Sequence, residues 1–193
     1  MRRFRLAVAA LLLATCAAPT LVGTELTPTA APDFTLADGI TGTPITLSSQ
    51  TGTVVVLSFL YTHCPDVCPL TAEQFRMAQQ RLTDDERGRT LFVAVSVDPR
   101  QDTPEAVQAF ARDHGLTKRF VFLVGGAAQL QAVWSAYGIR IETGPAASGV
   151  GHSDAIYLLD RRGRVRVLTH SDITAEALAG DVKLLLKEPG ASQ

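Results

Sequence analysis

Two apolar runs, each suited to a fully buried strand, constrain the fold of this chain most. Residues 53–61 (TVVVLSFLY) and 91–97 (LFVAVSV) are almost continuously apolar and rich in valine, a pattern typical of strands covered on both faces. Between them, the segment 69–82 begins with a proline, which suits the first turn of a helix. Buried strands joined by helices predict an α/β fold with helices on both faces of a central sheet.

The rest of the chain extends this alternation. Two short alternating segments, 34–36 and 45–47, predict a β-hairpin ahead of the first buried strand. The other expected elements are helix 103–115, strand 120–124, helix 127–137, strands 155–159 and 164–168, and helix 174–187. The order is then β-β-β-α-β-α-β-α-β-β-α, and its final β-β-α is the thioredoxin arrangement. We therefore expect a thioredoxin-like fold with a central mixed sheet and an N-terminal β-hairpin extension.

The first 23 residues have the layout of an export signal. Three arginines near the start precede an apolar run over 6–14, which is shorter than the roughly 20 residues of a membrane span. Cys16 ends a stretch similar to the lipobox of bacterial lipoproteins, so residues 1–23 are either an export signal or a lipoprotein or membrane anchor. Both alternatives place the protein outside the cytoplasm, in the periplasm or on the outer face of the membrane. We expect a linker over 24–32 and one domain over 33–193.

The composition excludes one broad class of partner. The chain has 18 Lys and Arg against 19 Asp and Glu, a net charge of −1 and a pI near 6.4. This balance leaves no basic excess to hold a nucleic-acid backbone, so we expect no nucleic-acid partner. The 193 residues, 46% of them hydrophobic, fit one globular domain with a short additional segment.

A pair of cysteines carries the most informative chemistry. Cys64 and Cys68 lie in the segment Phe59–Pro69 (FLYTHCPDVCP), where a buried strand ends and a helix begins. If the turn is helical, a separation of four positions brings both sulfurs to one face. The free N–H groups and the dipole of a helix N-terminus favour thiolate over thiol. Thiolates bind soft metals and attack disulfides, so both kinds of chemistry are open to this pair.

A metal site here needs a third ligand from elsewhere in the chain. Four histidines could supply it: His63, His114, His152 and His170. His152 follows a loop with glycines at its two ends, Gly144–Gly151, and precedes a strand. In a thioredoxin-like fold that loop faces the helix that begins at the cysteines, which makes His152 the best third ligand. Two soft thiolates select Cu(I), and one imidazole lets the same site hold Cu(II). Zinc usually takes a fourth ligand, and no other Cys or His is well placed for it.

Three other interpretations of the cysteine pair remain open. A structural disulfide would close only a small loop and stabilise little. A redox dithiol, acting as an extracytoplasmic thiol–disulfide reductase, is the serious competitor, although the spacing is not Cys-x-x-Cys. A peroxidase is the weakest, because no proline precedes Thr62 in the way a peroxidatic cysteine pocket requires. His152 could also be a structural histidine, as a lone histidine before a strand usually is.

Three segments resemble the Sco (Sco/SenC) family of copper chaperones for cytochrome c oxidase. The segment Tyr61–Pro69 is similar to the Cys-x-x-x-Cys-Pro signature of that family. The segment Ser96–Glu105 resembles its strand-turn-helix run, and His152-Ser153 followed by Tyr157–Asp160 resembles its histidine and the strand after it. Their order and spacing agree over roughly residues 32–188. One departure is Gly149-Val150-Gly151, where an acidic residue often precedes the family's histidine.

The resemblance implies a function and a set of ligands. The family's ligands fall on Cys64, Cys68 and His152, which would bind one copper, Cu(I) or Cu(II), per chain. Members are membrane-tethered and assist the binuclear copper centre of the oxidase, by delivering metal, by maintaining its thiols, or both. The implied partners are the copper-centre subunit of cytochrome c oxidase, other copper chaperones, and a thiol reductant for the redox-active pair Cys64 and Cys68. The implied role is that of a chaperone rather than an enzyme.

Two acids follow the second buried strand. Asp98 lies near the expected position of the cysteines and is a candidate to tune the copper site from outside the ligand set. An equally weighted interpretation is that Asp98 only fixes the backbone of a turn. For Asp102, beside the start of the next helix, we favour the backbone role.

Overall fold

The structure, a computed structural model, describes residues 20–116, 118–143 and 150–190. Its strands are β1 (Thr24–Ala30), β2 (Thr35–Asp38), β3 (Pro44–Thr46), β4 (Val54–Leu60), β5 (Thr90–Ser96), β6 (Phe120–Val124), β7 (Ile141–Thr143), β8 (Val150–His152), β9 (Ile156–Leu159) and β10 (Arg164–Thr169). Its α-helices are α1 (Val67–Arg81), α2 (Asp84–Gly88), α3 (Pro104–Asp113), α4 (Ala127–Ala136) and α5 (Ala175–Lys187), and one 3₁₀ turn spans Leu47–Gln50.

The central sheet is mixed, as predicted. Its eight strands lie in the order β1-β10-β9-β4-β5-β6-β2-β3. Strands β4, β5 and β6 are parallel to one another, while β9 is antiparallel to β4. Every residue of β4 and β5 is buried, which is what the two continuous apolar runs indicate. Because both central strands are covered on both faces, the fold needs helices on each side of the sheet.

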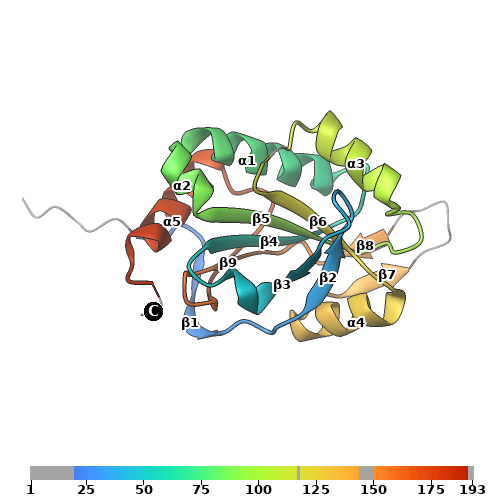
Figure 1. Cartoon of the computed structure of the whole chain (residues 1–193), viewed down its shortest axis with the longest axis horizontal. Helices are drawn as coiled ribbons and strands as arrows, with labels where there is room; N and C mark the ends of the chain where they lie inside the picture. The colour runs from blue at the N-terminus through green and yellow to red at the C-terminus, as the bar shows by residue number, and fades with distance from the viewer. Residues whose placement is uncertain (1–19, 117, 144–149, 191–193) are drawn as a thin grey trace, which may run out of the picture.

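Those helices lie on opposite faces of the sheet. Figure 1 shows α1 and α3 above the sheet and α4 below it, and α5 packs against α1. Helix α1 connects the parallel strands β4 and β5, and α3 connects the parallel strands β5 and β6. Both helices therefore cover the same face of the sheet in right-handed crossovers. The expected α/β, thioredoxin-like class is confirmed. The predicted N-terminal hairpin is also present, as β2 paired antiparallel with β3.

Residues 24–32 are not the linker that the sequence indicates. Thr24–Ala30 form β1, an edge strand paired antiparallel with β10. All of its residues except Leu26 are exposed, so burial does not alternate along it as it does along a strand packed on one face. Pro28 lies where the register shifts between Glu25 and Thr29, since proline within a sheet is confined to edges and bulges. Backbone pairing, rather than side-chain pattern, makes this segment part of the sheet.

The structure contains three short elements that the sequence does not predict. Helix α2 begins with a capping box between Thr83 and Glu86, and β7 and β8 form a small antiparallel sheet of their own. Residues 1–19, with the expected signal and Cys16, lie outside the described residues, so that assignment stays a prediction. Within the described part of the chain, no helix is both long and apolar enough to cross a membrane.

Candidate metal centre

The two cysteines lie at the junction between β4 and α1. The Cys64 backbone N–H donates to the Tyr61 carbonyl at 3.4 Å and so begins the turn that leads out of the sheet. Cys68 is in the first turn of α1, and its backbone N–H donates to Cys64 Sγ at 3.4 Å. The residue before the helix, Asp66, makes no side-chain cap. Cys64 sulfur therefore accepts from a free N–H at the helix N-terminus, as a capping oxygen does elsewhere.

The two sulfurs differ in exposure and in protonation. Cys68 is fully buried, whereas Cys64 is partly exposed, and both are free cysteines. A hydrogen bond from Cys68 lowers the pKa of Cys64 far below its usual value, and His152 and the backbone N–H groups of Asp66 and Cys68 act in the same direction against burial. The bond to Cys64, together with burial, raises the pKa of Cys68. The pair is thus one partly exposed thiolate beside one buried thiol.

His152 approaches this pair from a distant part of the chain. It is the last residue of β8, where it pairs with Ile141 of β7. Its Nε2 atom lies 3.9 Å from Cys68 Sγ, across a separation of 84 residues. Its Nδ1 atom lies 3.0 Å from the Ser153 carbonyl oxygen, which can only accept. Nδ1 therefore carries a proton, which leaves Nε2 as the ring atom directed at the cysteines.

Tyr61 is a part of the site that sequence reasoning missed. It is buried directly after β4, and its ring meets His152 edge to face, with centroids 5.8 Å apart. Burial, followed by the negative charge of Cys64 and a hydrogen bond to it, raises the pKa of Tyr61 to about 12. The hydroxyl therefore stays protonated and can donate to the thiolate. The sequence shows Tyr61 as the end of an apolar run and the start of the segment Tyr61–Pro69, and neither indicates its contact with His152.

The two acids after β5 have different surroundings. Asp98 is buried, but its carboxylate accepts hydrogen bonds from Arg100 N and Gln101 Nε2 in its own turn. A role for Asp98 in tuning the metal site therefore stays a prediction. Asp102 reaches the segment that carries the cysteines. It accepts from Thr62 N and Thr62 Oγ1, each at 2.8 Å, and from Ser96 Oγ. Its negative charge also contributes to the raised pKa of Cys68. Asp102 thus fixes the backbone two residues before Cys64.

An Asp102→Ala variant is expected to lose about 1–3 kcal/mol of unfolding free energy, because the Thr62 N–H would lose its partner in a largely buried place. Asp102→Asn keeps an acceptor and should recover most of this loss. Asp113→Ala, an exposed acid at the end of α3, is the matched control, with a change within about 0.5 kcal/mol. Urea denaturation measures all three, and equal stability of Asp102→Ala and the control would contradict this role.

The other candidate histidines lie in different surroundings. Nδ1 of His63 faces Thr62 Oγ1 at 2.9 Å, and the ring of His114 packs on Phe110. His170 is exposed, with Nδ1 against the Asp154 carbonyl. Of the four histidines, only His152 makes a hydrogen bond to a cysteine sulfur among the described residues. No group of three or more His, Cys, Asp or Glu side chains in residues 20–116, 118–143 and 150–190 stands close enough to hold a metal ion.

Comparison with known proteins assigns the chain to a family. The SCO1/SenC family model matches residues 23–187. The chain belongs to the SCO1/SenC family. One member with a similar sequence is Protein SenC of Rhodobacter capsulatus, 31% identical over 159 residues, which are 75% of this chain and 70% of that protein. Two further curated relatives are matched over only 61% and 43% of their own length.

Solved structures of SCO1/SenC proteins are similar in fold and sequence. The apo Sco1 protein of Thermus thermophilus has a TM-score of 0.75 and 29% identity, over 86% of this chain and 98% of that one. Bradyrhizobium japonicum ScoI, solved with copper bound, has a TM-score of 0.72 and 28% identity, over 82% of this chain and 100% of that one. The expected family is therefore confirmed, and the thioredoxin-like fold agrees with these neighbours.

Proposed function

We propose that this SCO1/SenC protein binds one copper ion with Cys64, Cys68 and His152 and delivers it to the binuclear copper centre of cytochrome c oxidase. One observation carries the proposal. His152 Nε2 lies 3.9 Å from Cys68 Sγ, although 84 residues separate them in the chain. The fold thus brings an imidazole to a pair of sulfurs that already share a helix N-terminus.

The chemistry of these side chains suits copper as a cargo. Two sulfurs are soft ligands that select Cu(I), and an imidazole allows Cu(II) as well. Cys64 is already a thiolate and partly exposed, so it offers the first contact to an incoming ion. The buried Cys68 thiol has to release its proton when it binds metal, which makes the affinity dependent on pH. The copper-bound ScoI structure, with 28% identity, supports copper as the cargo here.

The location and partners form part of the proposal. The arginines and short apolar run of residues 1–23 support export and attachment to the membrane. Copper delivery to the oxidase then takes place outside the cytoplasm, in the periplasm or on the outer face of the membrane. The partners are the copper-centre subunit of the oxidase, a donor of copper and a thiol reductant that keeps Cys64 and Cys68 reduced.

A second candidate function is thiol–disulfide reduction. The unequal protonation of the two cysteines favours it, because a partly exposed thiolate can attack and a buried thiol can resolve. Cys64 sulfur would attack a partner disulfide and release one partner thiolate. Cys68, after losing its proton, would attack Cys64 sulfur and release the second. The protein would end with a Cys64–Cys68 disulfide, and the partner would gain two electrons and two thiols.

Two parallel reactions with the copper-binding domain of the oxidase subunit distinguish the functions. In the first, the copper-loaded protein meets the reduced, metal-free domain, and we expect copper to appear in the domain with its binuclear absorption. In the second, the reduced, metal-free protein meets the domain with its cysteines oxidised. No copper transfer in the first reaction, with two new thiols per domain in the second, would contradict delivery and establish the reductase.

A further inference from the structure

Tyr61 contacts all three side chains that we propose as copper ligands. Its hydroxyl is hydrogen-bonded to the sulfur of Cys64, and its backbone N–H donates to the sulfur of Cys68. Its ring meets the imidazole of His152 edge to face, with the centroids 5.8 Å apart. The residue is only 4% exposed, so these contacts are shielded from water. Tyr61 is not needed to complete the ligand set, which leaves its hydroxyl without an assigned role.

The hydroxyl of Tyr61 is the donor in its hydrogen bond to Cys64. Cys64 is a thiolate, which can only accept, and the raised pKa of Tyr61 keeps the proton on its own oxygen. The hydroxyl oxygen in turn accepts from the backbone N–H of Val150, the first residue of β8. Because β8 ends at His152, the hydroxyl joins the Cys64 thiolate to the strand that carries the imidazole.

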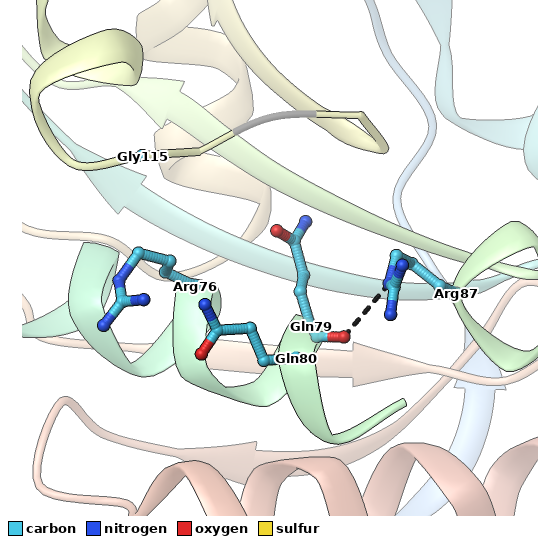
Figure 2. A pocket seen from close by; sticks show the side chains of 5 residues that line it. All are labelled: Arg76, Gln79, Gln80, Arg87 and Gly115. Carbon is cyan, nitrogen blue, oxygen red and sulfur yellow. Dashed lines mark hydrogen bonds between the residues drawn. The ribbon is translucent and has the colours of Figure 1, made fainter. Parts of the chain in front are cut away.

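The helix that carries Cys68 is held at its other end by Arg87. This side chain donates to the carbonyls of Gln79 and Leu82 at the end of α1, at 3.1 and 2.9 Å. Figure 2 shows the first of these hydrogen bonds, together with the other residues of a small polar pocket beside the helix. The last carbonyls of a helix otherwise have no partner within it. Arg87 therefore anchors α1, which keeps Cys68 in place beside Tyr61.

A hydrogen bond to a thiolate affects the two reactions of that thiolate differently. In thiol–disulfide exchange, the sulfur of Cys64 bonds to one sulfur of a disulfide, the old S–S bond breaks, and the other sulfur leaves as a thiolate. The negative charge moves away from Cys64, so the hydrogen bond from Tyr61 stabilises the starting thiolate more than the transition state. A thiolate bound to copper keeps other lone pairs and much of its charge, so it can still accept from Tyr61.

We propose that Tyr61 is a positioning residue whose hydroxyl slows disulfide exchange at Cys64 and leaves the thiolate available to copper. This role rests on the proposed function and deepens it, because it assigns the residue that favours copper binding over thiol–disulfide reduction. A phenylalanine in its place would keep the edge-to-face contact with His152 and remove only the hydroxyl.

The rate at which the reduced, metal-free protein reacts with oxidised glutathione at neutral pH tests this role. We expect Tyr61→Phe to react roughly three- to tenfold faster than the unmodified protein, because the attacking sulfur loses a hydrogen bond to its charge. Cys64 is already a thiolate, so a faster rate reports its nucleophilicity rather than its protonation. Tyr157→Phe is the matched control. It removes a hydroxyl that donates to the Tyr137 carbonyl at 2.8 Å, and it should keep the original rate.

The copper(II)-loaded protein provides a second measurement. The hydrogen bond lowers the energy of the sulfur lone pairs, so its loss in Tyr61→Phe should move the thiolate-to-copper(II) absorption to longer wavelength, while Tyr157→Phe should leave it unchanged. Equal exchange rates for the two variants, or equal absorption in their copper-loaded forms, would overturn the role of Tyr61. Faster exchange in Tyr61→Phe, with no copper bound by the unmodified protein, would instead contradict the proposed function and leave Tyr61 acting on exchange alone.

Discussion

A Cys68→Ser variant is expected to lose tight copper binding altogether. A serine hydroxyl is a hard ligand, and the single remaining thiolate with one imidazole makes a poor Cu(I) site. The fall in affinity should exceed about 100-fold, since even residues that only support a metal ligand cost roughly 10–100-fold when they are mutated. Competition for Cu(I) against a chromophoric chelator measures it. Cys64→Ser should behave in the same way, because both sulfurs are needed.

The third cysteine of the chain supplies a control for this experiment. Cys16 lies in the N-terminal segment, apart from the Cys64–Cys68 motif in sequence. Cys16→Ser in the full chain should therefore bind copper with the affinity of the unmodified protein. If Cys64→Ser or Cys68→Ser binds as tightly as Cys16→Ser, the proposed ligands are wrong.

Oxidation of the protein is expected to remove copper binding and to do so reversibly. The Cys68 thiol hydrogen-bonds to the Cys64 thiolate, and oxidation of the pair releases two electrons and the one proton of Cys68 as a disulfide forms. The same sulfurs cannot then coordinate a metal. Bound copper should fall from one ion per chain to near zero in the oxidised protein and return to one after reduction.

Thiol counting beside copper analysis checks this expectation. The reduced, metal-free protein should show reactive thiols at Cys64 and Cys68, while the copper-loaded protein should protect them. Full copper occupancy in a protein without free thiols at these positions would contradict the shared use of the sulfurs. Thiols that react in the copper-loaded form at the rate of the metal-free form would contradict it equally.

The sequence predicts those parts of the fold whose burial is visible in the pattern of apolar side chains. Strand β4 lies within the first apolar run and β5 begins one residue before the second, because residues covered on both faces are mostly apolar. Thr103 as the cap of α3, with Pro104 in its first turn, is also confirmed. The sequence indicates a linker at β1, because an exposed edge strand is defined by its hydrogen bonds to β10 rather than by the burial of its side chains.

The candidate site also has a part that the sequence predicts and a part that it does not. The spacing of Cys64 and Cys68 is local, so the sequence alone indicates their chemistry. The approach of His152 depends on β7 and β8, whose three residues each are too short to give a periodic signal. The contacts of Tyr61 and Asp102 are tertiary, between segments distant in the chain, and single-sequence patterns do not contain them.

The most direct measurement compares His152→Ala with His63→Ala for Cu(II) binding. His152 is the proposed third ligand, whereas His63 adjoins Cys64 but faces Thr62. His152→Ala should lose or shift the thiolate-to-copper(II) absorption and weaken Cu(II) more than Cu(I), since two thiolates alone can still hold Cu(I). His63→Ala should keep the absorption, and both variants should keep the far-UV circular dichroism of the unmodified protein. An intact absorption in His152→Ala would contradict the site, as would its loss in His63→Ala alone.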